Sequence, residues 1–484
     1  MNGQINNSVW VQVERPKGKT VLGTKTLFKR KIGKDGQIEK YKRRFANQGF
    51  RQVKGLHYHE SSSPTPTASS MRAVLATAAM KNWELRHIDV VQGCLQADID
   101  EELYIELPED YRAFPNAVGL LRKAIYGLVQ SELCWFRNFT DGIKEKGFEQ
   151  SHADPYVFRR IVDGEVVTVI VVYVDDILLA SKTKEGRTLS DLSSCFKVKD
   201  LGEAEFYLGC HITRNREART LTFDQHIYAE TVAKRFNVTK ISMIRMATGV
   251  KPLSKEEGPK NPKEREEMRR IPYREAVGTL MRAATMARPD LSFAAHNLAK
   301  FCDDPGPVHW KAAMKALRYF WRTKDLGITY GGVTSSGLTM SAYVDSDHAT
   351  CPDSRRSVSG GAVMLGGGTI SWFSRAQRVT ASASSESEYV ALAEIVNETK
   401  FLLHQVQEFI MPTLRSCTIS IMEDNQGAIK MANNKHSSRR TRHIDVKHLI
   451  VRDAVEEGLV RTVYVRNEEQ HADILTKALD MRTF

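Results

Sequence analysis

Residues 166–180 have the sequence VVTVIVVYVDDILLA, and this stretch decides the fold. The Val/Ile run before Tyr173 and the shorter apolar run after Asp176 are typical of strands that are buried on both faces. The chain must reverse between these runs, at Asp175-Asp176. We therefore predict a hairpin of two buried strands that carries two adjacent carboxylates at its turn.

The two adjacent carboxylates indicate a metal site. Flanked by apolar strands, they repel each other and are poorly solvated, which is costly unless a cation neutralises them. Mg²⁺ favours oxygen ligands and is the natural candidate. Asp89 lies near the end of another strand-like segment, residues 84–91. Three carboxylates at neighbouring strand ends could hold two ions that activate an attacking hydroxyl and stabilise a leaving phosphate oxygen. The alternative is an Asp-Asp turn exposed to water.

The N-terminal region is strongly basic. The chain has a formal net charge of +12, and residues 1–60 contain fourteen Lys and Arg against four acids. Two strand-like runs, residues 27–32 and 38–45, flank Lys34-Asp35-Gly36, and Asp-Gly between such runs is a hairpin signal. This charge favours a polyanionic partner such as nucleic acid or nucleotide phosphates, with a solvated basic surface as the alternative.

The remaining patterns predict a second, mixed α/β domain. A short helix is expected at residues 70–81, an exposed linker rich in Lys, Glu and Pro at 251–270, and a helical segment at 273–323. The last third alternates between the two periodicities, with strands at 338–344, 362–365, 369–373, 418–422 and 460–465, a long helix at 385–409, and a final helix containing Asp473.

Composition bounds the class of protein. A chain of 484 residues suits two to four domains of about 100–200 residues each. No apolar run follows Met1, so we expect no secretory signal, and residues 166–180 are too short and too charged for a membrane helix of roughly 20 residues. The seven cysteines form no CxxC pair, which disfavours a disulfide framework or a cysteine zinc site and favours a reducing cytosolic or nuclear compartment.

Several motifs resemble, in order along the chain, those of copia-type retrotransposon reverse transcriptases. They are Tyr41–Phe50 (YKRRFANQGF, similar to YKARLVAKGF), Asp89–Tyr111 (DVVQGCLQADIDEELYIELPEDY, similar to DVKTAFLNGDLEEEVYMEQPEGF), Lys123–Leu128 with Gln130 (similar to KALYGLKQ), Tyr173–Asp176 (YVDD), Asp200–Gly202 (DLG), Phe206–Gly209 (similar to FLG), and Pro272–Arg274 with Ala284–Leu291 (similar to PYR and TRPDI). On this resemblance the chain is identified as a reverse transcriptase and RNase H portion of a copia-type long-terminal-repeat Pol polyprotein.

The resemblance implies roles for particular residues in this first region. They are Asp89, Asp175 and Asp176 as ligands of two Mg²⁺ ions; Lys42, Arg44, Cys94 and Gln130 at the incoming deoxynucleoside triphosphate; and Tyr207, Leu208 and Gly209 as the primer grip. Mn²⁺ is the alternative ion. Cys94 stands where the family has an aromatic residue against the nucleotide sugar, which predicts weak discrimination against ribonucleotides. The competing hypothesis is that Cys94 only packs in the core.

A second set of motifs resembles the family's RNase H region. It comprises Ala342–Asp347 (AYVDSD), Asp353–Gly360 (DSRRSVSG), Ser384–Leu392 (SSESEYVAL), Glu423–Ala428 (EDNQGA), Arg440–Asp445 (RTRHID) and Gln470–Lys477 (QHADILTK). The resemblance implies that two further Mg²⁺ ions are held by four acids, namely Asp345, Glu388, Asp424 and Asp473.

Alternatives remain within this second set. Ser385 to Glu388 has the spacing of a capping box, so Glu388 could cap its helix while Glu386 serves as the catalytic acid. We interpret Asp347, Glu423 and Asp445 as solvated or supporting acids. His443 is a candidate base or ligand, and beside Arg439, Arg440 and Arg442 it is as well placed to contact the backbone of an RNA–DNA hybrid.

The implied fold is α/β (α+β), a fingers-palm polymerase over residues 1–250, a linker and helical connection over 251–335, and an RNase H-like mixed-sheet domain over 336–484. The implied function is RNA-directed DNA synthesis with RNase H activity on an RNA template, a DNA primer and the resulting RNA–DNA hybrid. The implied location is a cytoplasmic virus-like particle with a nuclear phase.

Departures from the family pattern leave other functions open. They are Ser62, Val91, Gly93-Cys94, Val129 and His348. None replaces a proposed metal ligand, but they are typical of a degenerating copy. One alternative is therefore a non-catalytic remnant that binds the hybrid, and another is an enzyme in which only RNase H works. We also expect protease and integrase regions to lie outside this chain.

Overall fold

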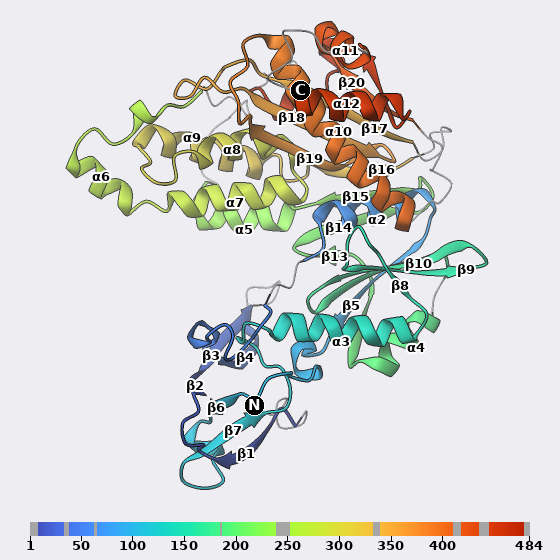
Figure 1. Ribbon diagram of the computed structural model, residues 1–484. Coiled ribbons are helices and arrows are strands. Elements are labelled where there is room, and N and C mark those ends of the chain that lie inside the picture. Colours follow the sequence, from blue (N-terminus) through green and yellow to red (C-terminus); the bar gives the residue numbers. More distant parts are fainter. Residues whose placement is uncertain are drawn as a thin grey trace. The chain divides into compact units, whose positions relative to one another are not determined.

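The structure is a computed structural model of the chain. It describes residues 8–32, 38–61, 65–183, 186–238, 252–332, 339–409, 418–434 and 445–478. Two compact units share these residues, and each is assembled from several chain segments (Figure 1). The first comprises Met1–Pro66, Arg86–Leu179 and Thr183–Glu203, and the second comprises Thr67–Leu85, Ala180–Lys182 and Ala204–Phe484.

The first unit is organised around a six-stranded sheet with the order β12-β5-β11-β10-β9-β8. Its strands are β5 (Glu84–Val90), β8 (Glu149–Gln150), β9 (Val157–Val162), β10 (Glu165–Tyr173), β11 (Asp176–Ser181) and β12 (Val198–Glu203). Four consecutive β10 residues, Val169 to Val172, are buried, because the strand is covered on both faces. Helix α3 (Ser131–Glu145) places Trp135, Phe139 and Ile143 at intervals of four on one side, and these residues join the core of the sheet.

Two smaller sheets complete the first unit. The first has the order β1-β7-β6-β2, and the second is the hairpin β3-β4. The elements are β1 (Trp10–Glu14), β2 (Val21–Leu22), β3 (Thr24–Ile32), β4 (Ile38–Asn47), β6 (Tyr104–Glu106), β7 (Ala117–Leu121), α4 (Gly186–Cys195), and the 3₁₀ helices η1 (Gly49–Arg51), η2 (Gly93–Gln96) and η3 (Glu109–Tyr111). The β3-β4 pairing confirms the predicted basic hairpin; its predicted turn lies outside the described residues.

The second unit contains a five-stranded sheet with the order β19-β18-β17-β20-β21. Its elements are β17 (Met340–Ser346), β18 (Val358–Leu365), β19 (Gly368–Ala376), β20 (Ile419–Glu423), β21 (Val460–Tyr464), α10 (Ser384–Phe409), α11 (Gln426–Asn433), α12 (Asp445–Glu456), and the 3₁₀ helices η8 (Asn467–Glu469) and η9 (Asp473–Leu475). Helix α10 packs on β17 and β18, and α11 and α12 pack on α10 (Figure 1). Strands β17 and β20 are parallel neighbours, so Asp345 and Asp424, near their carboxyl ends, lie at the same end of the sheet.

A four-stranded sheet and a helical layer form the rest of the second unit. The elements are β13 (Phe206–Tyr207), β14 (Cys210–Asn215), β15 (Thr220–Asp224), β16 (Gly327–Gly331), α2 (Ala68–Met80), α5 (His226–Arg235), α6 (Pro262–Arg269), α7 (Tyr273–Met286), α8 (Ser292–Ala299), α9 (Pro307–Arg322), and the 3₁₀ helices η4 (Lys255–Glu257) and η5 (Pro289–Leu291). Helices α5, α7, α8 and α9 share one apolar core.

The predicted α/β class, the central hairpin and the strand–helix alternation of the last third are confirmed. The linker predicted at 251–270 is wrong for its second half, where α6 forms. Asn261 accepts a hydrogen bond from the Glu264 backbone N–H and Pro262 occupies the first turn, which together start a helix without an apolar period. The final helix predicted around Asp473 is also wrong, since Asp473 begins a 3₁₀ turn.

The two compact units are not the three predicted domains, whose boundaries at residues 250 and 335 lie outside the described residues and stay a prediction. Helix α2 and the strands after Ala204 belong to the second unit, because their side chains pack there; Arg72, for example, is buried and donates to the carbonyl oxygens of Ile370 and Thr285. Within the described ranges, no helix combines the length and the apolar character needed to cross a membrane.

Candidate functional site: two acidic clusters

The turn between β10 and β11 is held in a strained conformation. Val174 has a φ of +55°, which is unusual for a β-branched residue. The Trp135 indole N–H donates to the Val174 carbonyl oxygen at 2.8 Å, and the Val90 backbone N–H donates to the Asp175 carbonyl oxygen at 2.7 Å. These two hydrogen bonds fix the turn on α3 and on β5, so Asp175 and Asp176 leave a backbone that is anchored on both sides.

Asp175 is a partly buried carboxylate whose two oxygens are hydrogen-bonded unequally. Its Oδ2 accepts a hydrogen bond from the Tyr126 hydroxyl at 3.2 Å. Its Oδ1 is buried and has no donor among the described residues that meets full hydrogen-bonding geometry, although the Gly93 backbone N–H approaches the carboxylate. Burial raises the pKa of Asp175, and the negative charges of Asp89 and Asp176 raise it further. A cation bound beside Oδ1 would remove this penalty, so the residues fit a divalent metal ion.

Asp176 and Asp89 lie beside Asp175 but are not closed around one point. Asp176 Oδ1 is 3.0 Å from His87 Nε2, and Asp89 is on β5, opposite Lys199 of β12. Among the described residues, these three acids do not form one of the groups whose ligand atoms all lie within 4.8 Å of one another. His87, which the sequence did not suggest, thus holds one of the three carboxylates.

The residues proposed to contact the nucleotide do not all lie near the three acids. The Arg44 guanidinium lies 5.9 Å from the centroid of the Tyr126 ring, so hairpin β3-β4 reaches the residue that donates to Asp175. The Lys42 side chain lies outside the described residues. Gln130 is buried, donates to the His57 carbonyl oxygen at 3.0 Å and accepts from the Gln52 amide at 2.9 Å. It lines a cavity of about 280 Å³, which none of the three acids lines.

Cys94 does not face an open pocket. It is 2% exposed and belongs to the core cluster of the sheet and α3. Burial, with the charge of Asp175, raises the pKa of its thiol to about 12. The structure therefore favours the alternative that Cys94 packs in the core. The partly buried aromatic side chain of Tyr126 packs against the core that contains Cys94. In the sequence, the only sign of a role for Tyr126 was its position within the motif Lys123–Leu128.

The candidate primer grip is a tight hairpin turn. Strands β13 and β14 pair through Phe206–His211 and Tyr207–Cys210, and Leu208 and Gly209 have φ values of +49° and +86°. Two positive φ values are typical of a type I′ turn. Tyr207 is fully buried, so its side chain supports the hairpin, while Phe206 is 44% exposed. An accessible primer contact can come from Phe206 or from the turn itself.

The second cluster converges from separate elements of the five-stranded sheet. Ligand atoms of Asp345, Asp424 and Asp473 lie within 4.8 Å of one another, and so do those of Glu388, Glu423 and Asp424. Asp345 is near the end of β17, Asp424 follows β20, and Glu388 is in the first turns of α10. The structure thus brings together all four acids that the resemblance implied and adds Glu423.

The geometry separates Glu388 from Glu386. The Glu386 carboxylate accepts from the Ser382 backbone N–H at 2.7 Å and from its hydroxyl at 2.6 Å, so it is the capping acid. Glu388 Oε2 is buried without a hydrogen-bond donor among the described residues. Burial, then the charges of Glu423, Asp345 and Asp424, raises the pKa of Glu388 to about 10.

Glu423 is a buried member of the cluster and is not solvated. Its Oε1 accepts from the Asn425 backbone N–H at 3.0 Å, and its buried Oε2 has no donor within the described part of the chain. Burial raises its pKa well above the usual value, and burial and Asp345 also raise the pKa of Asp424. Such unmatched carboxylate oxygens fit divalent metal ions.

Lys477 is the one cation that the structure places against this cluster within the described ranges. Its Nζ is 2.8 Å from Asp473 Oδ1 and 3.3 Å from Asp345 Oδ1. Although burial lowers the pKa of Lys477, the two carboxylates raise it above its usual value. Thr476 donates its hydroxyl to Asp345. Burial and Asp345 raise the pKa of Asp473 to about 6. The sequence motif contained Lys477, but nothing in its spacing predicted this contact.

Of the remaining candidate residues of the second region, the structure describes the side chain of Asp347 only. Asp347 is buried and accepts from Thr350 and from the Val358 backbone N–H, so it supports the chain after β17 and is not solvated. His443 and the arginines 439, 440 and 442 lie outside the described residues, as does the Asp445 side chain.

Comparison with known proteins decides the family. The sequence profile of the reverse transcriptase (RNA-dependent DNA polymerase) family matches residues 7–249. The chain belongs to this family. The Pol polyprotein of transposon TNT 1-94 from Nicotiana tabacum is 34% identical over 100% of the chain and 36% of that protein. That of transposon RE2 from Arabidopsis thaliana is 32% identical over 100% of the chain and 33% of that protein. The resemblance to copia-type Pol polyproteins is thus confirmed, and the chain spans about a third of the length of these relatives.

A solved structure supports the fold of this chain. The foamy viral protease-reverse transcriptase in complex with double-stranded DNA matches with a TM-score of 0.50 and 11% sequence identity. The match covers 94% of this chain and 67% of the viral one. At this identity the likeness concerns the fold alone.

The buried acids of the second cluster predict a stability that falls with pH in metal-free protein. Glu388 and Glu423 have raised pKa values, so the folded state binds more protons than the unfolded state above about pH 4.5, the usual Glu value. Their stabilising contribution is complete below that pH and is lost as the pH rises towards the folded pKa values, by up to about 1.4 kcal/mol per pH unit for one carboxyl. With a chelator present, the thermal unfolding midpoint should fall from pH 5 to pH 8.

The variant Glu388→Gln should flatten this slope, and Glu386→Gln, which removes only the capping acid, should keep it. The measurement is thermal unfolding of the full chain at a series of pH values. An identical slope in Glu388→Gln and in the unsubstituted chain would contradict the burial argument.

Cys94 predicts a packing effect. In Cys94→Phe the larger ring has to enter a filled core, and overpacking of this kind costs typically about 1–3 kcal/mol. Cys94→Ala should be milder, and ribonucleotide discrimination should not increase in Cys94→Phe. Chemical denaturation combined with incorporation assays for both nucleotide types measures this. A stable Cys94→Phe protein with sharpened discrimination would restore the sugar-contact hypothesis.

Proposed function

We propose that the chain is an RNA-directed DNA polymerase with RNase H activity that copies retrotransposon RNA into DNA. The observation that carries the proposal is the pair of acidic clusters, each with buried carboxylate oxygens that have no donor within the described residues: Asp175 in the first, Glu388 and Glu423 in the second. Membership of the reverse transcriptase family supports the first activity, and the sheet-edge convergence of Asp345, Glu388, Asp424 and Asp473 supports the second.

In the polymerase reaction, the primer 3′-hydroxyl attacks the α-phosphate of the nucleotide and pyrophosphate leaves. Asp89, Asp175 and Asp176 would hold two Mg²⁺ ions, which when bound favour ionisation of the hydroxyl and stabilise the leaving oxygen. Trp135 and Val90 keep the turn fixed, Tyr126 orients Asp175, and His87 holds Asp176 until a metal or substrate competes for it. Arg44, with Lys42 on the same hairpin, would bind the triphosphate.

In the nuclease reaction, a water attacks a phosphodiester of the RNA strand in the hybrid. Asp345, Glu388, Asp424 and Asp473 would hold the two ions, and Glu423 adds a fifth carboxylate behind them. Lys477 neutralises part of this charge through Asp345 and Asp473, which keeps the cluster assembled when no substrate is present. The foamy viral relative in fold was solved with double-stranded DNA, which supports a nucleic acid duplex as the partner.

The two activities should be separable. Asp175→Asn should lower magnesium-dependent DNA synthesis on a primed RNA template by at least about a thousand-fold while leaving hybrid cleavage nearly intact. Asp424→Asn should show the converse. Asp163→Asn, at the β9-β10 turn, is the matched control for the first, and Asp453→Asn, an exposed acid of α12, for the second. Equal loss of both activities in a folded variant would reject two sites.

Loss of both activities in the unsubstituted protein, with hybrid binding retained, would identify the chain as a binding remnant. Hybrid cleavage without synthesis would identify it as an RNase H alone.

Arg44 predicts a nucleotide-binding effect. A charge-assisted phosphate contact contributes about 1.5–3 kcal/mol, so Arg44→Ala should raise the apparent KM for deoxynucleoside triphosphates about ten-fold or more. Arg43→Ala is the matched control, because the neighbouring strand residue points to the other face and its guanidinium lies 5.7 Å from the Phe28 ring centroid. Steady-state kinetics measure the KM of both variants. An equal KM would mean that Arg44 does not bind the triphosphate and is a solvated surface residue.

A further inference from the structure

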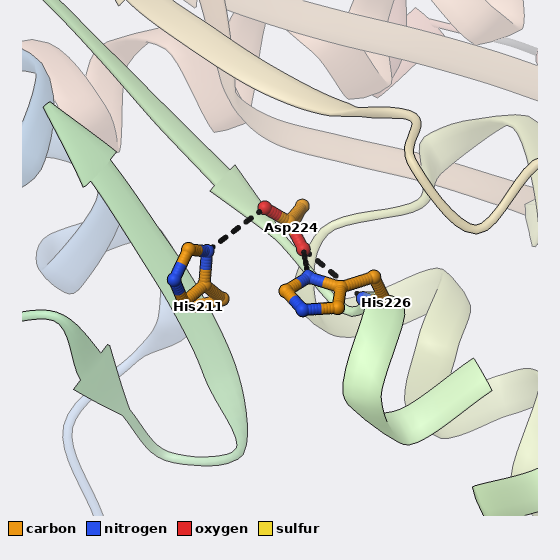
Figure 2. A group of neighbouring side chains, drawn as sticks. All are labelled: His211, Asp224 and His226. Carbon is orange, nitrogen blue, oxygen red and sulfur yellow. Dashed lines mark hydrogen bonds and ion pairs between the residues drawn. The ribbon is translucent and has the colours of Figure 1, made fainter. Parts of the chain in front are cut away.

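Two histidines flank one aspartate in the four-stranded sheet of the second unit, away from both acidic clusters in the sequence. His211 of β14 and Asp224 of β15 are cross-strand partners in the antiparallel register. His226 is the first residue of α5, directly after β15. Figure 2 shows the two imidazole rings on either side of the Asp224 carboxylate, both turned towards it. Three separate elements thus aim their side chains at one point.

The distances in this cluster suit a small metal ion. His211 Nδ1 is 3.4 Å from Asp224 Oδ2, and the ligand atoms of all three residues lie within 4.8 Å of one another. Ligands that are 2.0–2.2 Å from a tetrahedral zinc ion are themselves roughly 3.3 Å apart. The His211–Asp224 separation is therefore long for a hydrogen bond and matches that of two ligands of one ion, whereas the 2.6 Å between His226 Nδ1 and Asp224 Oδ1 is a hydrogen-bond distance that an ion would have to replace.

The Asp224 carboxylate is already oriented by the backbone. Its Oδ1 accepts from the His226 backbone N–H at 3.0 Å and is 2.6 Å from His226 Nδ1. This leaves Oδ2 directed to the side on which His211 lies. An outer hydrogen bond that fixes a ligating carboxylate is the usual support of a protein metal site.

The burial of the three side chains and the types of their ligand atoms indicate which ions the site could bind. The Asp224 side chain is 10% exposed, whereas those of His211 and His226 are 35% and 32% exposed. A nearly buried carboxylate is stabilised by a positive charge close to it, and the exposed imidazoles leave a path for an ion to enter. Two nitrogen ligands and one oxygen ligand suit Zn²⁺ and similar transition metals, whereas Mg²⁺ prefers oxygen ligands alone.

We propose that His211, Asp224 and His226 bind a zinc-class divalent ion, with a fourth coordination position left to water. The ion ties strand β14 to the start of α5. Since β14 continues directly from the Leu208-Gly209 turn, the ion fixes the base of the hairpin that carries the candidate primer grip. The site does not depend on the proposed polymerase or nuclease activity, because it shares no residue with either acidic cluster.

The competing arrangement is a metal-free one, in which His226 hydrogen-bonds the carboxylate and His211 Nδ1 lies 3.4 Å from Asp224 Oδ2 and 3.2 Å from the Thr213 hydroxyl. The edge-to-face contact of the two rings, with centroids 4.9 Å apart and an interplanar angle of 80°, is compatible with both arrangements. Direct metal binding separates them.

The test is zinc binding by the full chain after removal of metals, with Mg²⁺ in excess so that the acidic clusters are filled. Zn²⁺ is titrated against a chromophoric chelator for the unsubstituted chain and for the single variants His211→Gln, Asp224→Asn and His226→Gln. The control variant is His59→Gln, since His59 lies 3.8 Å from Glu101 but belongs to none of the groups of three close ligand residues among the described residues. Loss of an outer-shell partner of a metal ligand typically weakens metal binding 10- to 100-fold, so loss of a direct ligand should cost about 100-fold or more.

Two further readouts keep the test independent of folding defects. Co²⁺ bound to the unsubstituted chain should give the visible bands of a low-coordinate nitrogen and oxygen site, without thiolate charge-transfer absorption. Zn²⁺ should raise the thermal unfolding midpoint of the unsubstituted chain and of His59→Gln, because it binds only the folded state. Absence of a tight zinc site, equal affinity in all variants, or a thiolate signature from neighbouring Cys210 would each overturn the assignment.

Discussion

Carboxylates that are withdrawn from water and placed beside one another are the constraint on which both candidate sites depend. Burying an unpaired charge destabilises the folded state, and each further charge of the same sign nearby increases this free-energy penalty. Such groups persist only if the backbone beneath them is fixed by other interactions. In the first unit this is done by the Trp135 and Val90 hydrogen bonds to the β10-β11 turn, and in the second by parallel pairing of β17 with β20.

The two clusters relieve the repulsion in different ways. In the first, Tyr126 and His87 each engage one oxygen of a different aspartate, which spreads the three acids apart and leaves one Asp175 oxygen unmatched. In the second, Lys477 bridges Asp345 and Asp473, while Glu388 and Glu423 form no ion pair with any residue of the described ranges. The ligand atoms of the second cluster are therefore already grouped within 4.8 Å of one another, whereas those of Asp89, Asp175 and Asp176 are not.

The sequence predicted those features that depend on local pattern. The Val/Ile run predicted the buried hairpin, and the adjacent aspartates predicted where the first acidic cluster lies; the metal that they would bind stays a prediction. Contacts that depend on the tertiary fold were beyond it: Tyr126 and Lys477 reach their acids from elements whose packing no spacing reveals. Residues 224 and 226 were close in sequence, but only the β14-β15 register brings His211 to them. The interleaved units were equally hidden, because α2 packs with strands that come much later in the chain.

The departures from the family pattern can be judged in the same physical terms. A Cβ at Gly93 would lie 2.6 Å from Asp175 Oδ1 and 2.9 Å from the Trp135 ring, so an alanine there would have to displace one of them. Gly93 and the buried Cys94 thus change the packing around Asp175 without removing a ligand. For stability alone, replacing a buried unpaired acid by a neutral or apolar residue is often neutral or favourable. The chain instead keeps Asp175, Glu388 and Glu423 with buried oxygens that accept no well-formed hydrogen bond from the residues that the structure describes, at a cost to the fold. An arrangement that weakens the folded state, and that a bound cation would stabilise, is what the proposed metal sites would require.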